Sequence, residues 1–395
     1  MTEPVKGGAT GGGRVWAGGN RMGPAGLGVQ DERTARAVWS RLTEPGDVAA
    51  NRLVSSVGAE EALQAVLDGG DPRVEARWRV RLPDADVRRD LDRLADLGGR
   101  LIVPGDDQWP TALDDLDGRT PFCLWVRGPL ELGPAAERSV ALVGARAASS
   151  YGEHVATELA FGLAEHGFTV VSGAAYGIDA CAHRAALTAA GATVAVLACG
   201  VDRPYPRGNH RLIERIAMEG SVVSEIPPGC SPTRWRFVQR NRLIAALALG
   251  TVVVEAALRS GTSITAREAG ELGRPVGAVP GPVTSPTSAG CHELLRLGAV
   301  CVTCVDEIVE LVSALGEGLA GRPRTPVADH DGLAPDDLRV LDAVPLRRAA
   351  PAGTVARTAG LEPRRVAATL ALLEVRGLVR SDGAGWVRAG GAAST

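Results

Sequence analysis

Arginine and aromatic residues alternate in one short stretch of the chain, PTRWRFVQRNRLIA, at residues 232–245. Four arginines fall within nine residues there, and no acidic residue occurs between Glu225 and Glu255. Guanidinium groups neutralise phosphates and aromatic rings stack on bases, so this combination is typical of sites that bind single-stranded nucleic acid with little sequence preference. A basic helix start with aromatic residues in the core is the competing interpretation, and the stretch alone does not exclude it.

Three other segments place glycine or hydroxyl residues at an expected helix start, where free backbone amides bind anions. Gly144 and Arg146 follow the apolar run SVALV, the loop SGAAYGID covers residues 172–179, and ALRSGTSITA covers residues 257–266. Each has a structural alternative, because glycine also makes tight turns and Ser or Thr also caps helices. Asp179 would repel a phosphate, so we expect it to brace its loop or the following helix.

Residues for catalysis or metal binding are harder to find. The six histidines form no H-x-x-x-H pair, the chain has no G-x-S-x-G elbow, and the loop at Gly144 lacks the G-x-G-x-x-G pattern of dinucleotide sites. Cys301 and Cys304 form a C-x-x-C in an apolar run without a second pair. We therefore predict no catalytic residue, no metal and no cofactor, and structural roles for His183 and His292.

The overall charge also limits the function. The chain of 395 residues has a net charge of -3 and only one lysine, Lys6, so any nucleic-acid site must be a local patch of arginines. The seven cysteines are dispersed and suit small buried residues in a reducing compartment. With no signal-peptide pattern and no apolar run of about 18 residues, we predict a cytoplasmic protein without membrane contact.

Short apolar runs alternate with helix-length segments from about residue 138 onward. The runs are SVALVG, FTVVSG, ATVAVLACG, SVVSE, TVVVEA, PVGAVPG and AVCVT. This alternation predicts an α/β fold with an extended Rossmann-like, doubly wound and mostly parallel sheet. The first intervening helix should carry a capping box, Ser150-x-x-Glu153, and a core stripe of Val155, Leu159 and Leu163.

Composition divides the chain into five segments. Residues 1–29 are rich in glycine and aperiodic, which indicates a disordered leader or a misplaced start site, and residues 30–99 contain three helical patterns of a small helical domain. The core is expected at 100–315, a linker at 316–334, and three helical segments with a hairpin at 335–391. Three helical segments followed by a hairpin indicate a winged-helix-like domain.

The core closely resembles the DNA-processing protein A family, also called DprA or Smf. The matching segments are VALVGARAASSYG, VVSGAAYGIDACAHRAAL, VAVLACGVDRPYP, VSEIPPG, RFVQRNRLIAAL, VVVEAALRSGTSITAREA and AVPGPVTSPTSAGCHELLRLGA. They follow one another at natural spacing between about residues 138 and 300, and IVPGDDQWPTALDDLDGRTPFCLWVRG before them also looks like this family.

The resemblance implies a function as well as a fold. It implies a non-enzymatic homodimer that binds single-stranded DNA and helps to load the RecA recombinase during uptake of transforming DNA and recombination. Carried onto this chain, the DNA pocket would use Gly144, Arg146, Ser172, Gly173, Gly177, Phe237, Arg240, Asn241, Arg242, Gly261, Thr262, Ser263 and Thr265. The chain departs from many relatives at Ala145 and Ala174, and arginines must replace their lysine contacts, which preserves charge but changes geometry.

Two other functions stay open at this stage. A nucleotide phosphoribohydrolase on a related fold would use a P-G-G-x-G-T loop, whereas this chain has Arg259-Ser-Gly-Thr there. A transcription regulator would read duplex DNA through the helix predicted at 363–376, which carries Arg364, Arg365 and Arg376. Release of free base, or sequence-selective protection of a duplex, would distinguish these functions from single-strand binding.

Overall fold

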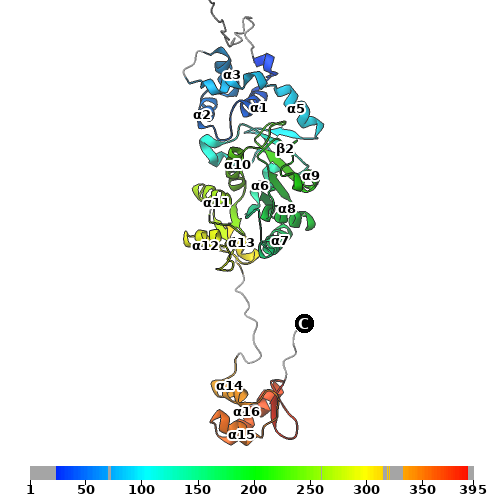
Figure 1. Cartoon of the computed structure of the whole chain (residues 1–395), viewed down its shortest axis with the longest axis vertical. Helices are drawn as coiled ribbons and strands as arrows, with labels where there is room; N and C mark the ends of the chain where they lie inside the picture. Colours follow the sequence, from blue (N-terminus) through cyan, green and yellow to red (C-terminus); the bar gives the residue numbers. More distant parts are fainter. Residues whose placement is uncertain are drawn as a thin grey trace, which may run out of the picture. The chain divides into compact units, whose positions relative to one another are not determined.

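The computed structural model describes residues 24–69, 73–258, 260–314, 318, 320 and 332–389 (Figure 1). The described residues form two separate units, divided between Ala320 and Gly321. Residues 1–23 of the predicted leader, and residues 316–317, 319 and 321–331 of the predicted linker, lie outside the described residues. Within the predicted leader, Pro24–Leu27 forms a 3-10 turn and Leu27 is buried, so this part of the segment belongs to the folded region.

A nine-stranded sheet forms the centre of the first unit. Its strands are β1 (Arg100–Ile102), β2 (Leu124–Arg127), β3 (Ser139–Val143), β4 (Thr169–Ser172), β5 (Thr193–Val196), β6 (Ser221–Ser224), β7 (Gly250–Val253), β8 (Val276–Ala278) and β9 (Val300–Cys301), in the order β1-β2-β6-β5-β4-β3-β7-β8-β9. All neighbours from β6 to β9 pair in parallel, and each of the seven predicted apolar runs overlaps one of these strands. The prediction of an α/β fold with a mostly parallel sheet is confirmed.

Two strands were missed. β2 pairs antiparallel with β6, and β1 pairs antiparallel with β2, which extends the sheet at one edge. Both lie in the segment that precedes the first predicted strand. All four residues of β2 are buried, so its sequence LWVR gives no alternation of apolar and polar residues.

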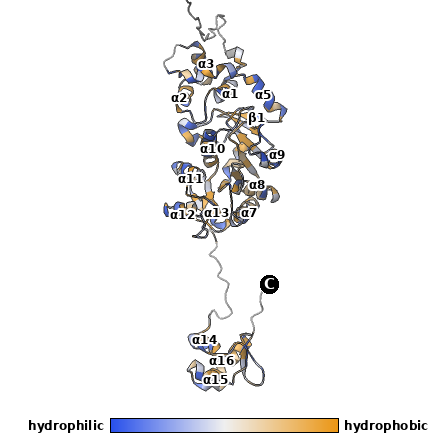
Figure 2. Cartoon of the chain, in the orientation of Figure 1, coloured by the Kyte–Doolittle hydropathy of each residue, from blue (hydrophilic) through white to orange (hydrophobic). Residues whose placement is uncertain are grey.

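Helices cover both faces of the sheet because alternate residues of each strand point to opposite faces. In β3, Val140 and Leu142 pack with α7 (Ser150–Glu165), α8 (Ile178–Thr188) and α13 (Val305–Val312). Ala141 and Val143 pack on the other face with α10 (Arg234–Leu247), α11 (Thr262–Glu271) and α12 (Ala289–Arg296). Figure 2 shows the hydrophobic colour concentrated on the strands between these layers. The remaining helices around the sheet are η3 (Thr111–Arg119), α6 (Leu132–Glu137), η4 (Arg207–Asn209) and α9 (His210–Glu219).

The start of α7 corrects one prediction. Its N-cap is Ser149 rather than Ser150, and the Ser149 hydroxyl accepts a hydrogen bond from the Gly152 amide at 3.1 Å. The predicted stripe is present, with Leu159 and Leu163 buried and Val155 partly buried.

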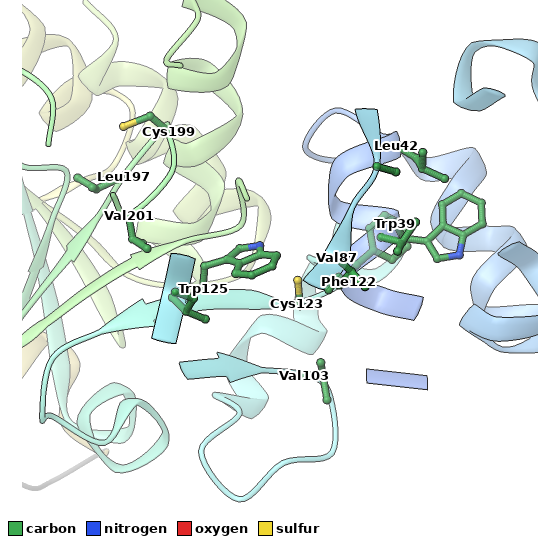
Figure 3. Close-up of a cluster of buried hydrophobic side chains, with 14 of the residues drawn as sticks. Trp39, Leu42, Val87, Val103, Phe122, Cys123, Trp125, Leu197, Cys199 and Val201 are labelled. Atoms are coloured by element: carbon green, nitrogen blue, oxygen red, sulfur yellow. The ribbon is translucent and has the colours of Figure 1, made fainter. Parts of the chain in front are cut away.

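The N-terminal helices pack directly against the sheet. They are α1 (Glu32–Leu42), α2 (Val48–Val57), α3 (Ala59–Asp68), α4 (Ala76–Val80), η2 (Leu82–Asp84) and α5 (Val87–Asp96). The segments predicted helical contain α1, α3 and α5, whereas α2 and α4 were not predicted. Figure 3 shows Trp39 and Leu42 of α1 in one buried cluster with Trp125 of β2 and Leu197 after β5. The helical region therefore shares a core with the sheet.

The second unit is a small α/β module with its own core. It contains α14 (Pro335–Ala343), α15 (Ala352–Ala359), α16 (Pro363–Val375) and an antiparallel pair, β10 (Val379–Ser381) and β11 (Trp386–Arg388). Val340, Val355 and Leu370 are fully buried within it. The three predicted helical segments and the hairpin are present in the predicted order.

Candidate functional site

A groove of about 630 Å³ opens at the carboxyl ends of β3, β4 and β7. The sheet order reverses between β3 and β7, and open α/β sheets bind their ligands at such a point. The groove is lined by Val143, Gly144, Ala145, Arg146, Ala147, Ala175, Asp179, Arg234, Phe237, Val238, Arg240, Asn241, Ile244, Ala257, Ser260, Gly261, Thr262, Ile264, Thr265 and Thr287. Three of these residues are arginines and one is a carboxylate, so the groove is cationic.

Glycines allow the first two loops of the groove to meet. A Cβ on Gly144 would lie 2.5 Å from Ile178, and a Cβ on Gly177 would lie 2.3 Å from the carbonyl oxygen of Ala145. Gly177 also has a positive φ of 73°, which glycine adopts without strain. These glycines are therefore required for the close approach of the loops, whatever the groove binds.

Arg240 lies at the floor of the groove with only 5% of its surface exposed. Its Nη1 donates to the carbonyl oxygens of Gly173, at 2.8 Å, and of Val196, and its Nε donates to Asn241 Oδ1 at 3.3 Å. A Cβ on Gly173 would overlap the guanidinium, so glycine makes room for it. Burial lowers the pKa of Arg240 to about 10, with Asp179 acting in the opposite direction.

Asp179 braces its loop, as the sequence predicts. Its Oδ2 accepts hydrogen bonds from the amides of Gly173 at 3.2 Å and Ala175 at 3.3 Å. Burial raises the pKa of this carboxyl, whereas Arg240 and the two amides favour the charged form. Asp179 and Arg240 thus form an oppositely charged pair in the floor of the groove.

Arg146 is exposed at the rim and lies over an aromatic ring. Its guanidinium carbon is 5.2 Å from the centre of the Phe237 ring, a cation–π geometry. Tyr205, from the loop after β5, contacts the same ring with a centroid distance of 5.6 Å. Arg234, in the first turn of α10, is also exposed and lines the groove. Neither arginine forms an ion pair with a described carboxylate.

The start of α11 faces the groove, and no side chain caps its first backbone amides. Gly261 is its N-cap, makes no side-chain capping hydrogen bond, and no acidic residue lies in the first turn. Asn241 Nδ2 donates to the Gly261 carbonyl oxygen at 3.2 Å and holds this turn against α10. The amides and the hydroxyls of Thr262 and Thr265 can therefore bind an anion, assisted by the helix dipole.

Several predicted site residues do not line the groove. Ser172 is fully buried and its hydroxyl donates to the Leu142 carbonyl oxygen at 2.6 Å. Gly173 and Gly177 lie behind the groove as described above, and Ser263 is also absent from its lining. Arg242 is also outside the lining, and eight of the thirteen predicted residues line the groove: Gly144, Arg146, Phe237, Arg240, Asn241, Gly261, Thr262 and Thr265.

Arg242 requires a correction. Its side chain is buried, and both terminal nitrogens donate to the Glu225 carboxylate at 2.6 Å. A guanidinium whose charge is already neutralised in the interior does not reach a phosphate in the groove. Glu225 lies just after β6. It is the acidic residue that comes immediately before the stretch without acidic residues, and it is also the partner of Arg242.

The structure adds residues that the sequence interpretation missed. Tyr205 and Arg207 are exposed in the loop after β5, and Asn209 donates to the carbonyl oxygens of Ala174 and Ala175 at 3.0 and 2.9 Å. Tyr176 accepts a hydrogen bond from the Gly208 amide at 3.1 Å. The run VDRPYPRGN follows a predicted strand, which was the signal available for this loop.

Glu255, the acidic residue that precedes the loop at 257–266, is 1% exposed and does not line the groove. Its carboxylate accepts hydrogen bonds from the Ser149 amide at 2.9 Å, the Ser149 hydroxyl at 2.6 Å and the Thr287 hydroxyl at 2.8 Å. It therefore links the start of α7 to the loop before α12. Arg259, in the corresponding loop, lies outside the described residues.

The histidines and cysteines of the described residues form no cluster of metal ligands. His183 is fully buried with its Nδ1 2.8 Å from the Thr193 hydroxyl, and His292 Nε2 lies 3.0 Å from the Gly281 carbonyl oxygen. The seven cysteines are free, and Cys301 and Cys304 are exposed. No described helix is long and apolar enough to cross a membrane.

Comparison with known proteins agrees with this arrangement. Residues 100–313 match the family model of the DNA recombination-mediator protein A. A DNA processing protein DprA of Mycobacterium tuberculosis is 48% identical over 379 residues, which cover 90% of this chain and 95% of that protein. The chain belongs to the DNA recombination-mediator protein A family.

A solved structure of a family member resembles this one. The DNA processing protein A of Streptococcus pneumoniae has a TM-score of 0.61 and 31% identity, covering 72% of this chain and 99% of that one. The DNA processing protein A of Helicobacter pylori, described for its single-stranded DNA binding mode, has a TM-score of 0.48 and 30% identity, covering 53% of this chain and 93% of that one. The predicted membership of the DprA/Smf family is confirmed.

Proposed function

We propose that this family member binds single-stranded DNA with little sequence preference in the cationic groove. The observation that carries the proposal is the convergence of Arg146, Arg234 and the start of α11 on one edge of the sheet, beside the partly exposed ring of Phe237 and the exposed ring of Tyr205. Arginines and free amides bind phosphates of any sequence, and aromatic faces stack on any base.

The proposed contact residues differ from the sequence-based set. Gly144, Arg146, Gly261, Thr262 and Thr265 stay in it, together with Asn241, and Arg234 is added from the groove lining. Tyr205 and Arg207 are added at the rim: neither lines the groove, but Tyr205 contacts the ring of Phe237 and Arg207 is exposed in the same loop. Ser172, Gly173, Gly177 and Arg240 support the loops that carry these groups. Ser263 and Arg242 are removed because neither lines the groove.

The biological role that we propose is the one that family membership implies. The protein would act as a homodimer, without a catalytic step, and help to load the RecA recombinase onto the strand during recombination and DNA uptake. The absence of an acidic residue other than Asp179 from the groove lining favours binding over hydrolysis. We also propose the division that the sequence predicts, into a helical domain at 30–99, a core at 100–315 and a terminal domain at 335–391, with the helical domain packed against the core.

The second unit has the element order of a winged helix, and we propose that it is one. A winged helix reads duplex DNA through polar side chains on its third helix, here α16. The exposed face of α16 includes Ala367, Ala371, Leu372 and Val375, and Arg365 pairs with Asp336 at 2.8 Å. Arg364 and Glu374 are exposed on the same helix, so its exposed surface is mixed and does not by itself favour duplex DNA over a protein partner.

A competition titration tests the proposed function. Labelled oligo-dT is titrated with the full chain at several salt concentrations, in competition with unlabelled single-stranded or duplex DNA. We expect the single strand to compete more strongly and the affinity to fall as salt increases. Arg146→Ala should weaken binding, whereas Arg88→Ala, which removes an exposed arginine of α5 away from the groove, should not. Equal affinity of the two variants would contradict the proposal.

A further inference from the structure

Phe237 is the aromatic residue that the sequence places in the groove, but little of its ring is free. The Arg146 guanidinium lies 5.2 Å from the ring centre, the Arg240 guanidinium 6.0 Å, and Tyr205 contacts it at an interplanar angle of 51°. Phe237 is only partly exposed. A base that stacked on this ring would have to displace one of these neighbours.

Tyr205 differs from Phe237 in its exposure. Tyr205 is 44% exposed, and it stands next to the groove lining because its ring contacts that of Phe237, which lines the groove. Its hydroxyl makes no hydrogen bond with a described residue. Tyr176 is also exposed, but its hydroxyl is bonded to the Gly208 amide and fixes the loop. Trp235 is exposed on α10, but unlike Tyr205 it makes no ring contact with a described residue of the groove.

The loop that carries Tyr205 is held at several points. The Gly200 amide donates to the Cys230 carbonyl oxygen at 3.0 Å, and Asp202 accepts from the Gly229 amide at 2.8 Å. Asn209 bonds to the carbonyl oxygens of Ala174 and Ala175 at the other end. A ring on a restrained loop loses little entropy when a base stacks on it. Arg203 and Arg207 are exposed in the same loop and place positive charge beside Tyr205.

We infer that Tyr205 is the base-stacking residue of the groove and that Phe237 is a positioning residue, which holds Arg146 where it contacts a phosphate. The inference rests on the proposed function and assigns separate tasks to two touching rings. Tyr205 contributes a contact that does not depend on charge. Phe237 acts through Arg146, because a guanidinium over an aromatic face loses part of its rotamer freedom before any DNA is bound.

Variants of the full chain separate the two tasks. Tyr205→Leu keeps apolar volume against Phe237 but has no aromatic face, and Tyr205→Phe keeps the face. Phe237→Leu keeps volume in α10 but removes the ring beneath Arg146. The probes are oligo-dT with a salt series and an oligonucleotide containing 2-aminopurine, whose fluorescence falls when the base stacks on an aromatic ring. Circular dichroism and thermal melting identify variants that fail to fold.

We expect Tyr205→Leu to weaken binding about tenfold and to reduce the quenching of 2-aminopurine, with the salt dependence unchanged. Tyr205→Phe should behave as the unmodified protein does. Phe237→Leu should keep the quenching but lower the salt dependence, as Arg146→Ala does, and the two changes combined should cost no more than Arg146→Ala alone.

The outcomes distinguish this inference from the proposed function. If the unmodified protein does not bind oligo-dT, the proposed function fails. If it binds and folded Tyr205→Leu retains affinity and quenching, the role of Tyr205 is wrong. If Phe237→Leu loses the quenching with an unchanged salt dependence, the assignments are reversed and the inference is overturned. A variant that does not fold is replaced by Tyr205→Met or Phe237→Met, which are judged by the same criteria.

Discussion

Two cavities open at opposite edges of the sheet and differ in charge. The groove of about 630 Å³ at the carboxyl edge is lined by Arg146, Arg234 and Arg240 with Asp179 as its one carboxylate. A cavity of about 890 Å³ at the amino edge, before β3, β7 and β8, is lined by Asp106, Asp107, Asp115 and Glu137 with Arg274. The second cavity is larger, so size alone does not identify the site for an anionic ligand.

The difference lies in which charges are already paired. Arg274 donates to the carbonyl oxygens of Ala112 and Ala248 at 3.0 and 2.7 Å and to Asp115 at 3.1 Å, so it is occupied by protein groups. Asp107 and Glu137 are exposed there and form no ion pair with a described residue. At the carboxyl edge the exposed charges are Arg146 and Arg234. Unpaired charge, rather than the number of charged residues, separates an edge suited to polynucleotide from one that repels it.

The largest effect is expected for a substitution of Arg242, which should change stability. This residue tests the difference between lining the groove and merely belonging to the helix that borders it. It lies in α10 with Arg234 and Arg240 but is bonded to Glu225. Arg242→Met should lower the free energy of unfolding by about 3–5 kcal/mol, because it leaves a buried carboxylate without its partner. Urea denaturation followed by tryptophan fluorescence measures the change. Arg242→Met combined with Glu225→Gln should recover a large part of it, and a fully stable single variant would refute the structural role.

Reversing one charge at the carboxyl edge tests the groove directly. Arg146→Glu should weaken binding of oligo-dT on the order of 100-fold at low salt, since it removes a phosphate contact and adds repulsion. The difference from the unmodified protein should shrink as salt is raised, because salt screens exposed charges. Fluorescence anisotropy over a salt series gives both quantities. A loss that is equally large at all salt concentrations would mean that the residue acts through the fold.

Lowering the pH should reduce the stability of the fold through His183, which is buried behind the groove. Burial lowers the pKa of this ring to about 3 from 6.5, with Arg240 and Arg184 acting in the same direction. The unfolded chain therefore binds the extra proton between these pH values, so stability is complete above pH 6.5 and falls as pH decreases through the window. By pH 5 this effect of His183 should have lowered the free energy of unfolding by about 2 kcal/mol.

Urea denaturation at pH 7.5 and pH 5 measures this effect, and His183→Gln should reduce the difference between the two. His154→Gln, at an exposed position of α7, is the control and should leave the difference unchanged. If His183→Gln and the unmodified protein show the same dependence on pH, the ring is not the group that titrates.

The smallest effect is expected at the amino edge. Glu137→Arg should change the affinity for oligo-dT by less than about twofold at physiological salt, because screening is strong beyond about 8 Å. The measurement is the same anisotropy titration as for Arg146→Glu. A gain or loss as large as that of the groove variant would show that overall charge, and not the groove, controls binding.

Local patterns were sufficient to predict many elements. Apolar β-branched runs marked the seven parallel strands, and the bracing role of Asp179 followed from its charge beside an expected anion site. Prediction failed where contacts with residues distant in the sequence determine the local structure. Ser149 rather than Ser150 caps α7, and its hydroxyl also bonds to Glu255, 106 residues away. The short strands β1 and β2 show no periodicity and are recognised by their pairing.

The sequence by itself determined the fold class, the family and the loops that meet at the carboxyl edge, because apolar runs and glycine-rich turns act locally and parallel strands end together. Tertiary structure decided which side chains are free to act. Arg242 meets Glu225, 17 residues away, and is neutralised, while Tyr205 meets Phe237 and remains exposed. Charge and aromatic character can be read from a residue, but burial and pairing depend on what the fold brings beside it.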